Sequence, residues 1–328
     1  LNLNDSVLYH WSLLDNINEA VQCLLEHVEN DNQIHIIVDP DCDGQCSAAM
    51  LYRYLKLFNH SINLSYSIHS GKEHGISKDI TIPENIKLLL VPDAGTNDVQ
   101  QCQELKEKGI DIIILDHHLA DQINSNAIIV NNQTCNYPNK NLSGAGVVYK
   151  FLQAIDELTW NDYADNFLDL VALANIGDSM DIRSFETKRL IDKGLNKIRS
   201  KFFKALIDKQ SYSMGNDITI NNIQFYIVPL INAMVRAGDY DEKEMMFKAF
   251  IEIDETFKYK PRRKSKDDPE PEEIDETIYD RVARLCINAK QRQNKSNDTN
   301  LTKLYDYIQE KGYDKNKIII ANATNKLD

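Results

Sequence analysis

Short apolar runs alternate with amphipathic segments over the first part of the chain. The runs have the length of β-strands and occur at Ile34–Val38, Ile62–Ile68, Lys87–Val91, Asp111–Leu115 and Ala127–Val130. Between them, Ser47–Phe58 and Val99–Lys108 carry apolar side chains on one helical face. This alternation predicts an α/β fold built on a parallel sheet.

From Gly144 the pattern becomes helical and stays so. The helical segments are Val147–Leu158, Tyr163–Ile176, Glu186–Ile198 and Lys201–Asp208. We therefore expect residues 1–245 to form one domain, in which a parallel sheet is followed by helices.

The composition changes after residue 245. Lys258–Lys266 is basic and Asp267–Glu276 is acidic, which is typical of a solvated linker. Ile278–Lys311 lacks Pro and Gly and predicts exposed helix with a break near Asn297–Asn300. We expect residues 246–312 to be a charged linker and helical connector. The strand-like Ile318–Ala321 predicts that residues 313–328 begin an incomplete second domain.

The net charge and the cysteines restrict the class of partner and the compartment. There are 37 Lys and Arg against 50 Asp and Glu, and the resulting charge of −13 argues, taken alone, against a polyanionic partner. No apolar stretch approaches the roughly 20 residues of a membrane span, and no signal peptide is visible. Six cysteines without a C-x-x-C pair indicate free thiols. We expect a cytoplasmic protein without a membrane partner, and the Asn-, Ile- and Lys-rich composition suggests a bacterial or phage-infected cell.

Acidic and histidine side chains follow several of the predicted strands. Asp39, Asp41 and Asp43 lie directly after the first strand, where they can converge on a cation or cap the next helix. The string D-x-D-x-D-G also opens an EF-hand loop, but its twelfth position is Met50 rather than Glu. Asp93 follows another strand, and alone it fits a loop role equally well.

Two more sites complete the pattern. Asp116, His117 and His118 stand together at a strand end, where two imidazoles and a carboxylate suit a metal. Asp178 ends a helical run and could be only a helix terminus. Because the carboxyl ends of parallel strands share one crevice, these groups can meet there although they are distant in sequence. Such a cluster needs cations to neutralise it, and two Mn²⁺ or Mg²⁺ ions fit oxygen-rich ligands better than zinc does.

The ordered series DPDCDG, Asp93, DHH at 116–118 and Asp178 resembles the four motifs of the DHH phosphoesterase superfamily. Its spacers are most similar to the RecJ branch of single-strand-specific 5′→3′ exonucleases. Further matching strings include LSGAGVVYKFL (142–152) and PLINAMVRAGDYD (229–241), so the resemblance spans residues 34–241.

The resemblance implies roles for individual residues. Asp93 would bridge two metals, one held by Asp43, His117 and Asp178 and the other by Asp41 with Asp39. His118 and Asp116, which belong to the same motif, would be catalytic residues, and His118 would face the scissile phosphate as a hydrogen-bond donor. Asn232 and Arg236 would bind a substrate phosphate, although a helix-face Asn and a surface ion pair, with Asp239 for example, are the alternatives. Where the family has Tyr-Gly, this chain has His74-Gly75, and we expect a solvated loop histidine there.

The implied function is a metal-dependent exonuclease that hydrolyses single-stranded DNA from the 5′ end in repair, recombination or replication. One alternative is a phosphodiesterase of short oligonucleotides or cyclic dinucleotides, or a pyrophosphatase. An alternative of another class is an inactive scaffold that binds replication or repair proteins. Basic residues of the connector could track DNA phosphates or simply decorate a solvated helix.

Overall fold

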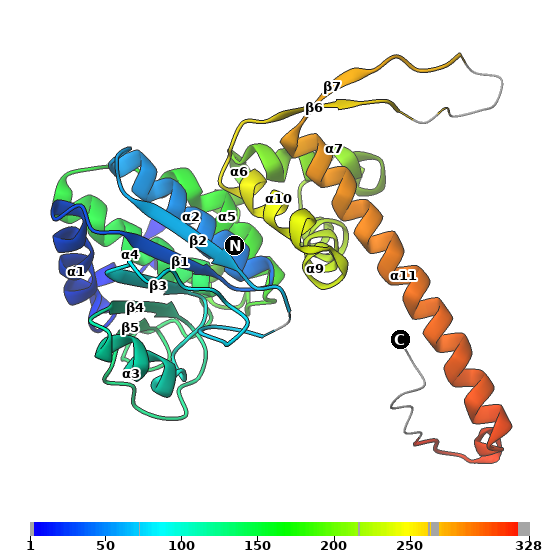
Figure 1. Cartoon of the computed structure of the whole chain (residues 1–328), viewed down its shortest axis with the longest axis horizontal. Coiled ribbons are helices and arrows are strands. Elements are labelled where there is room, and N and C mark those ends of the chain that lie inside the picture. The colour runs from blue at the N-terminus through cyan, green and yellow to red at the C-terminus, as the bar shows by residue number, and fades with distance from the viewer. Residues whose placement is uncertain (1–2, 72, 216, 262, 264–268, 321–328) are drawn as a thin grey trace.

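The computed structural model of the 328-residue chain describes residues 3–71, 73–215, 217–261, 263 and 269–320. Its core is a five-stranded parallel sheet, so the predicted α/β fold class is confirmed. The strands lie in the order β2-β1-β3-β4-β5 (Figure 1). Their bounds are β1 Ile34–Val38, β2 Leu64–Ile68, β3 Leu88–Pro92, β4 Asp111–Asp116 and β5 Ile128–Asn131.

Each face of the sheet packs against its own set of helices, because successive side chains of a strand point to opposite faces. In β3, Leu88 and Leu90 join the main core, whereas Leu89 and Val91 join a smaller core. The main core is covered by α1 Ile17–Glu29, α2 Cys42–Phe58, α4 Gly144–Thr159 and α5 Leu168–Gly177, and the smaller one by α3 Val99–Glu107. Every residue of α5 up to Ile176 is buried, as expected for a helix that is apolar on all sides.

A helical layer follows the sheet. It consists of η3 Ala164–Phe167 (before α5), α6 Phe185–Asn196, α7 Lys201–Met214, α8 Ile220–Asn222, the π-helical turn η4 Ile223–Ile227, α9 Val228–Ala237 and α10 Tyr240–Phe250. Short 3-10 turns occur at η1 Asp5–Val7, η2 Trp11–Leu13 and η5 Tyr313–Lys315. In the part of the chain that the structure describes, no helix is both long and apolar enough to cross a membrane.

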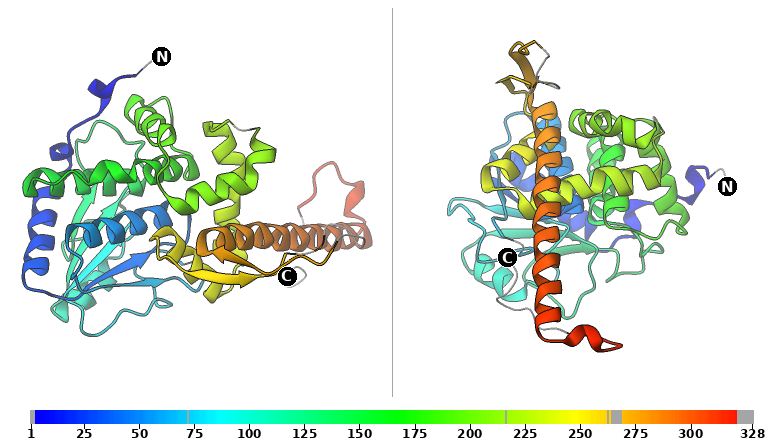
Figure 2. Two further views of the ribbon diagram at one scale, coloured as in Figure 1. Left: turned by 90° about the horizontal axis from the view of Figure 1, so that it is seen from above. Right: turned by 90° about the vertical axis from the view of Figure 1, so that its right-hand side faces the viewer.

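The connector is one uninterrupted helix, α11 Ile278–Glu310, so the predicted break near Asn297–Asn300 is wrong. At about 1.5 Å per residue its 33 residues extend roughly 50 Å. Its buried residues end at Ala289, and the remainder projects from the molecule (Figures 1 and 2). Thr299 and Thr302 donate their hydroxyls to carbonyls one turn back, which satisfies polar groups that would otherwise compete with the helix.

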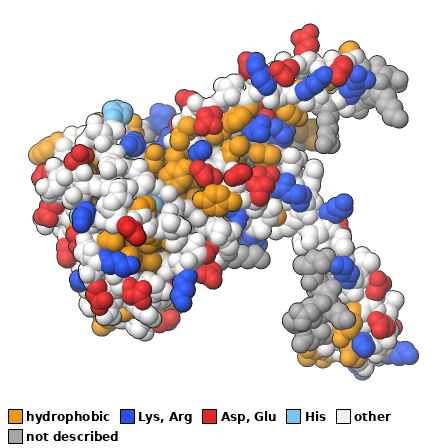
Figure 3. Space-filling view, viewed as in Figure 1, with side chains coloured by type: hydrophobic (Ala, Val, Ile, Leu, Met, Phe, Trp, Pro, Cys, Tyr) orange, Lys and Arg blue, Asp and Glu red, His pale blue; other side chains and the backbone are white. Residues whose placement is uncertain are grey.

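The segment predicted to be a linker contains a projecting hairpin. Strands β6 Thr256–Tyr259 and β7 Ile274–Thr277 pair in antiparallel fashion. Across the pair, Nζ of Lys258 lies 2.6 Å from Oδ1 of Asp275. Figure 3 shows both signs of charge mixed along this arm. The prediction of a strand at Ile318–Ala321 is wrong for residues 318–320, which are exposed and form no strand, and Ala321 lies outside the described residues.

Candidate metal centre

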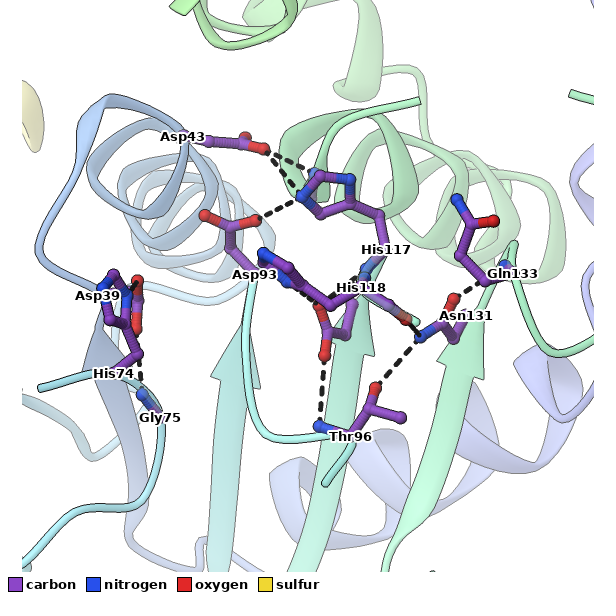
Figure 4. Close-up of polar contacts among 12 residues, drawn as sticks. Asp39, Asp43, His74, Gly75, Asp93, Thr96, His117, His118, Asn131 and Gln133 are labelled. Carbon is purple, nitrogen blue, oxygen red and sulfur yellow. Dashed lines mark hydrogen bonds and ion pairs between the residues drawn. The ribbon is translucent and has the colours of Figure 1, made fainter. Parts of the chain in front are cut away.

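The acidic loops converge at the carboxyl end of the sheet, next to the point where the strand order reverses. The loop after β1 supplies Asp39, Asp41 and Asp43, and the loop after β3 supplies Asp93. Because β1 and β3 are neighbours whose crossovers run in opposite directions, a crevice forms between these loops. Figure 4 shows Asp39, Asp43, Asp93 and His117 around this crevice.

Helix α2 begins inside the acidic motif, at Cys42, whereas the sequence predicts a start at Ser47. Its first turn is capped by Asp41, whose Oδ1 accepts a hydrogen bond of 2.9 Å from the Gly44 amide. A side chain at position 44 would place its Cβ only 2.5 Å from the Cβ of Asp39. The DPDCDG string therefore requires its glycine for close approach of the two backbone segments.

Asp43 is held by the start of another helix. Its Oδ2 accepts from the Gly144 amide at 2.7 Å and its Oδ1 from the Ala145 amide at 2.8 Å, both in the first turn of α4. The positive end of the helix dipole favours a carboxylate there. The LSGAGVV string contributed only to the family resemblance in the sequence, and its contact with Asp43 was not predicted.

Asp93 lies at the centre of the group in an unusual conformation. Its φ is +67°, in the left-handed region that non-glycine residues seldom adopt, and its side chain is buried. The Oδ1 atom of Asp93 has no hydrogen-bond partner among the described residues. A buried carboxylate oxygen without a partner is costly unless a cation neutralises it.

His117 and Asp178 complete the cluster. The Nε2 atom of His117 lies 3.3 Å from Oδ1 of Asp93, 3.6 Å from Oδ2 of Asp178 and 3.7 Å from Oδ2 of Asp43. Asp178 reaches this point from the C-cap of α5. One imidazole nitrogen is therefore surrounded by three carboxylates that come from three separate parts of the chain: the first turn of α2, the residue after β3 and the C-cap of α5.

The carboxylates of the cluster destabilise one another. Burial, followed by the charge of Asp43, raises the pKa of Asp178 to about 6 and that of Asp93 well above its usual range. Burial likewise raises the pKa of Asp39 and of Asp41. The cluster thus favours bound cations over bare charges.

The donor set fits two hard divalent cations. Three sets of side chains at this edge each bring their ligand atoms within 4.8 Å of one another: Asp43, His117 and Asp178; Asp93, His117 and His118; and Asp39, Asp41 and Asp93. Asp93 belongs to two of these sets, and its Oδ1 accepts no hydrogen bond among the described residues, which suits a shared ligand. Carboxylate oxygens with one or two imidazoles suit Mn²⁺ or Mg²⁺.

Asp116 is close to the cluster but does not enter any of these sets. Its Oδ1 accepts from the His117 amide at 2.7 Å and from Nδ1 of His118 at 2.8 Å, and its Oδ2 accepts from the Thr96 amide at 3.1 Å. Burial alone would raise the pKa of Asp116, but these bonds outweigh it and hold the pKa below its usual range. The same bond to Asp116 raises the pKa of His118 to about 9. Asp116 therefore orients the two histidines, and His118 stays half-exposed beside the crevice.

Two further contacts were missed from the sequence. His74 is an exposed loop residue, as expected, but its Nδ1 also lies 2.6 Å from Oδ2 of Asp39, a contact that the sequence did not predict. This bond raises the pKa of His74. Asn131, at the end of β5, donates to Oγ1 of Thr96 and to the carbonyl of His118. Its position after a strand at the same edge was the available signal.

Asn232 and Arg236 lie on α9, which begins beside the last turn of α5: a Cβ at Gly177 would be 3.8 Å from Val228. No hydrogen bond or ion pair joins Asn232 or Arg236 to the acidic cluster in the described residues. The Oδ1 atom of Asn232 is buried without a partner. The Arg236 side chain is exposed and has no ion pair in the described chain, so the alternative of a pair with Asp239 is not observed.

The comparisons with known proteins agree with this geometry. Residues 33–175 match the model of the DHH family, N-terminal domain. The chain carries a DHH family domain. That domain contains the loops of Asp39 to Asp43, of Asp93 and of the DHH motif itself, whereas Asp178 follows directly after it.

The DHH chain also matches longer curated relatives. It is 40% identical over 329 residues to the SPbeta prophage-derived protein YorK of Bacillus subtilis (strain 168), which carries the name of a single-strand DNA-specific exonuclease; the match covers all of this chain and 56% of YorK. It is 29% identical over 255 residues to the single-stranded-DNA-specific exonuclease RecJ of Haemophilus influenzae, covering 71% of this chain and 43% of RecJ. The chain thus spans about half the length of the curated relatives it matches.

Solved structures confirm the fold. A manganese-bound exonuclease RecJ matches with a TM-score of 0.69 at 20% identity, over 89% of this chain and 69% of that one. RecJ from Thermus thermophilus in complex with Mn²⁺ matches with a TM-score of 0.67 at 20% identity, over 89% of this chain and 40% of that one.

Proposed function

We propose that this DHH chain hydrolyses phosphodiester bonds of single-stranded DNA, from the 5′ end, with two Mn²⁺ or Mg²⁺ ions. The observation that carries the proposal is the buried Oδ1 of Asp93, which accepts no hydrogen bond among the described residues and belongs to two sets of candidate ligands. The names of YorK and RecJ supply the substrate class.

Each residue of the candidate metal centre has a distinct role in this proposal. Asp43, His117 and Asp178 would hold one ion, Asp39 and Asp41 the other, and Asp93 both. Two such ions would activate a water molecule and neutralise charge on the phosphate. The bond to Asp116 raises the pKa of His118, and its half-exposed imidazole would donate a hydrogen bond to the scissile phosphate. Asp116 positions the imidazole for this step.

The phosphate next to the scissile bond would be bound from α9. Arg236, exposed and free of ion pairs in the described chain, offers a planar fork of donors to a phosphate. The side-chain amide of Asn232, on the same helix, would also contact this phosphate. We assign catalysis to residues 1–245, a connecting role to residues 246–312 and the start of a second domain to residues 313–328. The work would take place in the cytoplasm, in repair, recombination or replication, alongside proteins of those processes.

The test is digestion of end-labelled single strands, duplexes and dinucleotides in Mn²⁺ and in EDTA. We expect mononucleotides from the 5′-phosphorylated single strand, little from the duplex, and none in EDTA. Cleavage of dinucleotides while long strands stay intact would favour a short-oligonucleotide phosphodiesterase instead. Inertness on every substrate would favour a scaffold.

A further inference from the structure

A segment beside the metal centre is free of acidic residues. Between Ile218 and Gly238 the sequence contains no Asp or Glu and one cation, Arg236. A surface that approaches a polyanion must avoid carboxylates, so this segment is suited to lie along a nucleic-acid strand.

Two aromatic side chains of this segment are held outward. In the π-helical turn η4, the Val228 amide bonds to the carbonyl of Ile223, five residues back. Ile223 and Ile227 point into the core, whereas Phe225 is 69% and Tyr226 39% exposed. Such π-turns are rare and frequently occur at functional sites. Exposed rings of this kind have no part in the core of the chain.

One end of the turn lies beside the metal centre. Nε2 of Gln224 lies 3.5 Å from Oγ of Ser179, and Ser179 immediately follows Asp178. At its other end the turn continues directly into α9, which carries Asn232 and Arg236. The two rings therefore lie in the short stretch of chain between the Gln224–Ser179 contact and the helix that carries Asn232 and Arg236.

We propose that Phe225 and Tyr226 form a stacking platform for the bases of a single strand whose phosphate occupies the metal centre. The inference rests on the proposed function and extends it by naming a base-binding site. Stacking on aromatic rings tolerates any base and leaves the phosphates to Arg236 and the metal ions. A bare phosphate or pyrophosphate would gain nothing from it, so the platform favours strands over those substrates.

The test compares binding of two probes by fluorescence anisotropy in Mn²⁺. One probe is a phosphorothioate oligothymidylate, which resists hydrolysis, and the other is a phosphorothioate oligomer of abasic sites, which has the same charges without bases. The variant Phe225→Leu/Tyr226→Leu keeps apolar area and removes both rings. The control Tyr212→Leu removes a fully exposed ring from α7.

We expect the double variant to bind oligothymidylate about 5- to 150-fold more weakly for each base that loses its stack. Binding of the abasic oligomer should not change, the control should match the wild type, and Phe225→Trp should retain affinity. Three results would each overturn the platform. The double variant could bind oligothymidylate as tightly as the wild type, it could lose affinity equally for both probes, or the wild type could fail to bind oligothymidylate. Wild-type affinity of the Phe225→Leu/Tyr226→Leu variant for oligothymidylate would also indicate that the two rings form an apolar surface for a protein partner.

The proposed function can fail separately. A wild type that cleaves nothing, while the double variant loses base-dependent binding, would refute catalysis and leave the platform in place. A wild type that degrades single strands, while the double variant binds them normally, would refute the platform alone.

Discussion

Asp178 carries its negative charge at a cost to the folded protein. Burial and the neighbouring Asp43 raise its pKa to about 6, which means that the ionised form is less stable in the fold than in the unfolded chain. The imidazole that faces Asp178 is shared with two other carboxylates. A residue that destabilises the metal-free protein in this way is expected to be retained for binding a cation.

Substituting Asp178→Asn should separate activity from stability. We expect activity in Mn²⁺ to fall by at least about a hundredfold, because a direct ligand matters more than the outer partners that typically give 10–100-fold losses. In EDTA the variant should melt at the same temperature as the wild type or higher, since one repelling charge is gone. Asp181→Asn is the matched control, because Asp181 lies three residues on and pairs with the exposed Arg183. Full activity in Asp178→Asn would refute the ligand assignment.

Gly144 is a second position at which one residue determines the site. A Cβ there would lie 2.3 Å from Oδ1 of Asp93 and 2.6 Å from its Cβ. Gly144→Ala should therefore displace the central carboxylate, lower the free energy of unfolding by about 1–3 kcal/mol and abolish the stabilisation that Mn²⁺ gives the wild type. Urea unfolding with and without Mn²⁺ measures both effects. Gly71→Ala is the control, because its Cβ would meet nothing closer than 3.4 Å; identical curves for the two variants would contradict the prediction.

At the scale of elements, strands could be predicted well and helix limits less well. The run Ile34–Val38 is matched to the residue by β1, in which all five residues are buried and four are apolar. The start of α2 was missed because Asp41 serves as helix cap and as candidate ligand at once. The break in α11 was wrong because the polar Asn297–Asn300 stretch was weighed without the threonine hydroxyls that bond back to the helix. The candidate ligands could be predicted from the sequence because each follows a strand or a helix. The contacts of His74 and Gly144 could not, because they join segments that are distant in sequence.

Strand β1 also carries a buried histidine that should make stability depend on pH. Burial lowers the pKa of His35 to about 4, and its two ring nitrogens contact Ser65 and Ser67 of β2. Between about pH 6.5 and 4 the unfolded chain binds the proton and the folded chain does not, so stability falls as the pH falls through this window. The loss should reach up to about 3 kcal/mol.

His35→Gln keeps polar contacts at this position without a titrating group. Urea unfolding of this variant, followed from about pH 7 to about pH 4, should lack the loss that the wild type shows. Parallel pH dependences for the two proteins would contradict the assignment.

At the scale of the whole molecule, several cations near the connector are already neutralised. Arg284 pairs with Glu276, and Arg292 pairs with Glu242. The hairpin pairs Lys258 with Asp275 in the same way (Figure 3). The pairs of Arg284 and Arg292 neutralise part of the basic surface that the sequence suggested for tracking phosphates. The net charge of −13 disfavours attraction of a DNA strand by the molecule as a whole, so we expect binding to be local, at the metal centre and the acid-free segment beside it.

Binding of a single strand should consequently depend only weakly on salt. Each neutralised phosphate of a single strand contributes about −0.7 to the slope of log K against log salt. We expect a slope between about −1 and −2 in Mn²⁺, which corresponds to about two or three phosphates, measured by anisotropy of a phosphorothioate oligothymidylate. Arg236→Gln should reduce the magnitude of the slope by about 0.7, because the Arg236 guanidinium would face a phosphate. Arg292→Gln should leave the slope unchanged, because Arg292 is already paired with Glu242. A slope of about −4 or steeper would instead require an extended basic surface, and an effect of Arg292→Gln as large as that of Arg236→Gln would place the strand on α11 rather than at the metal centre.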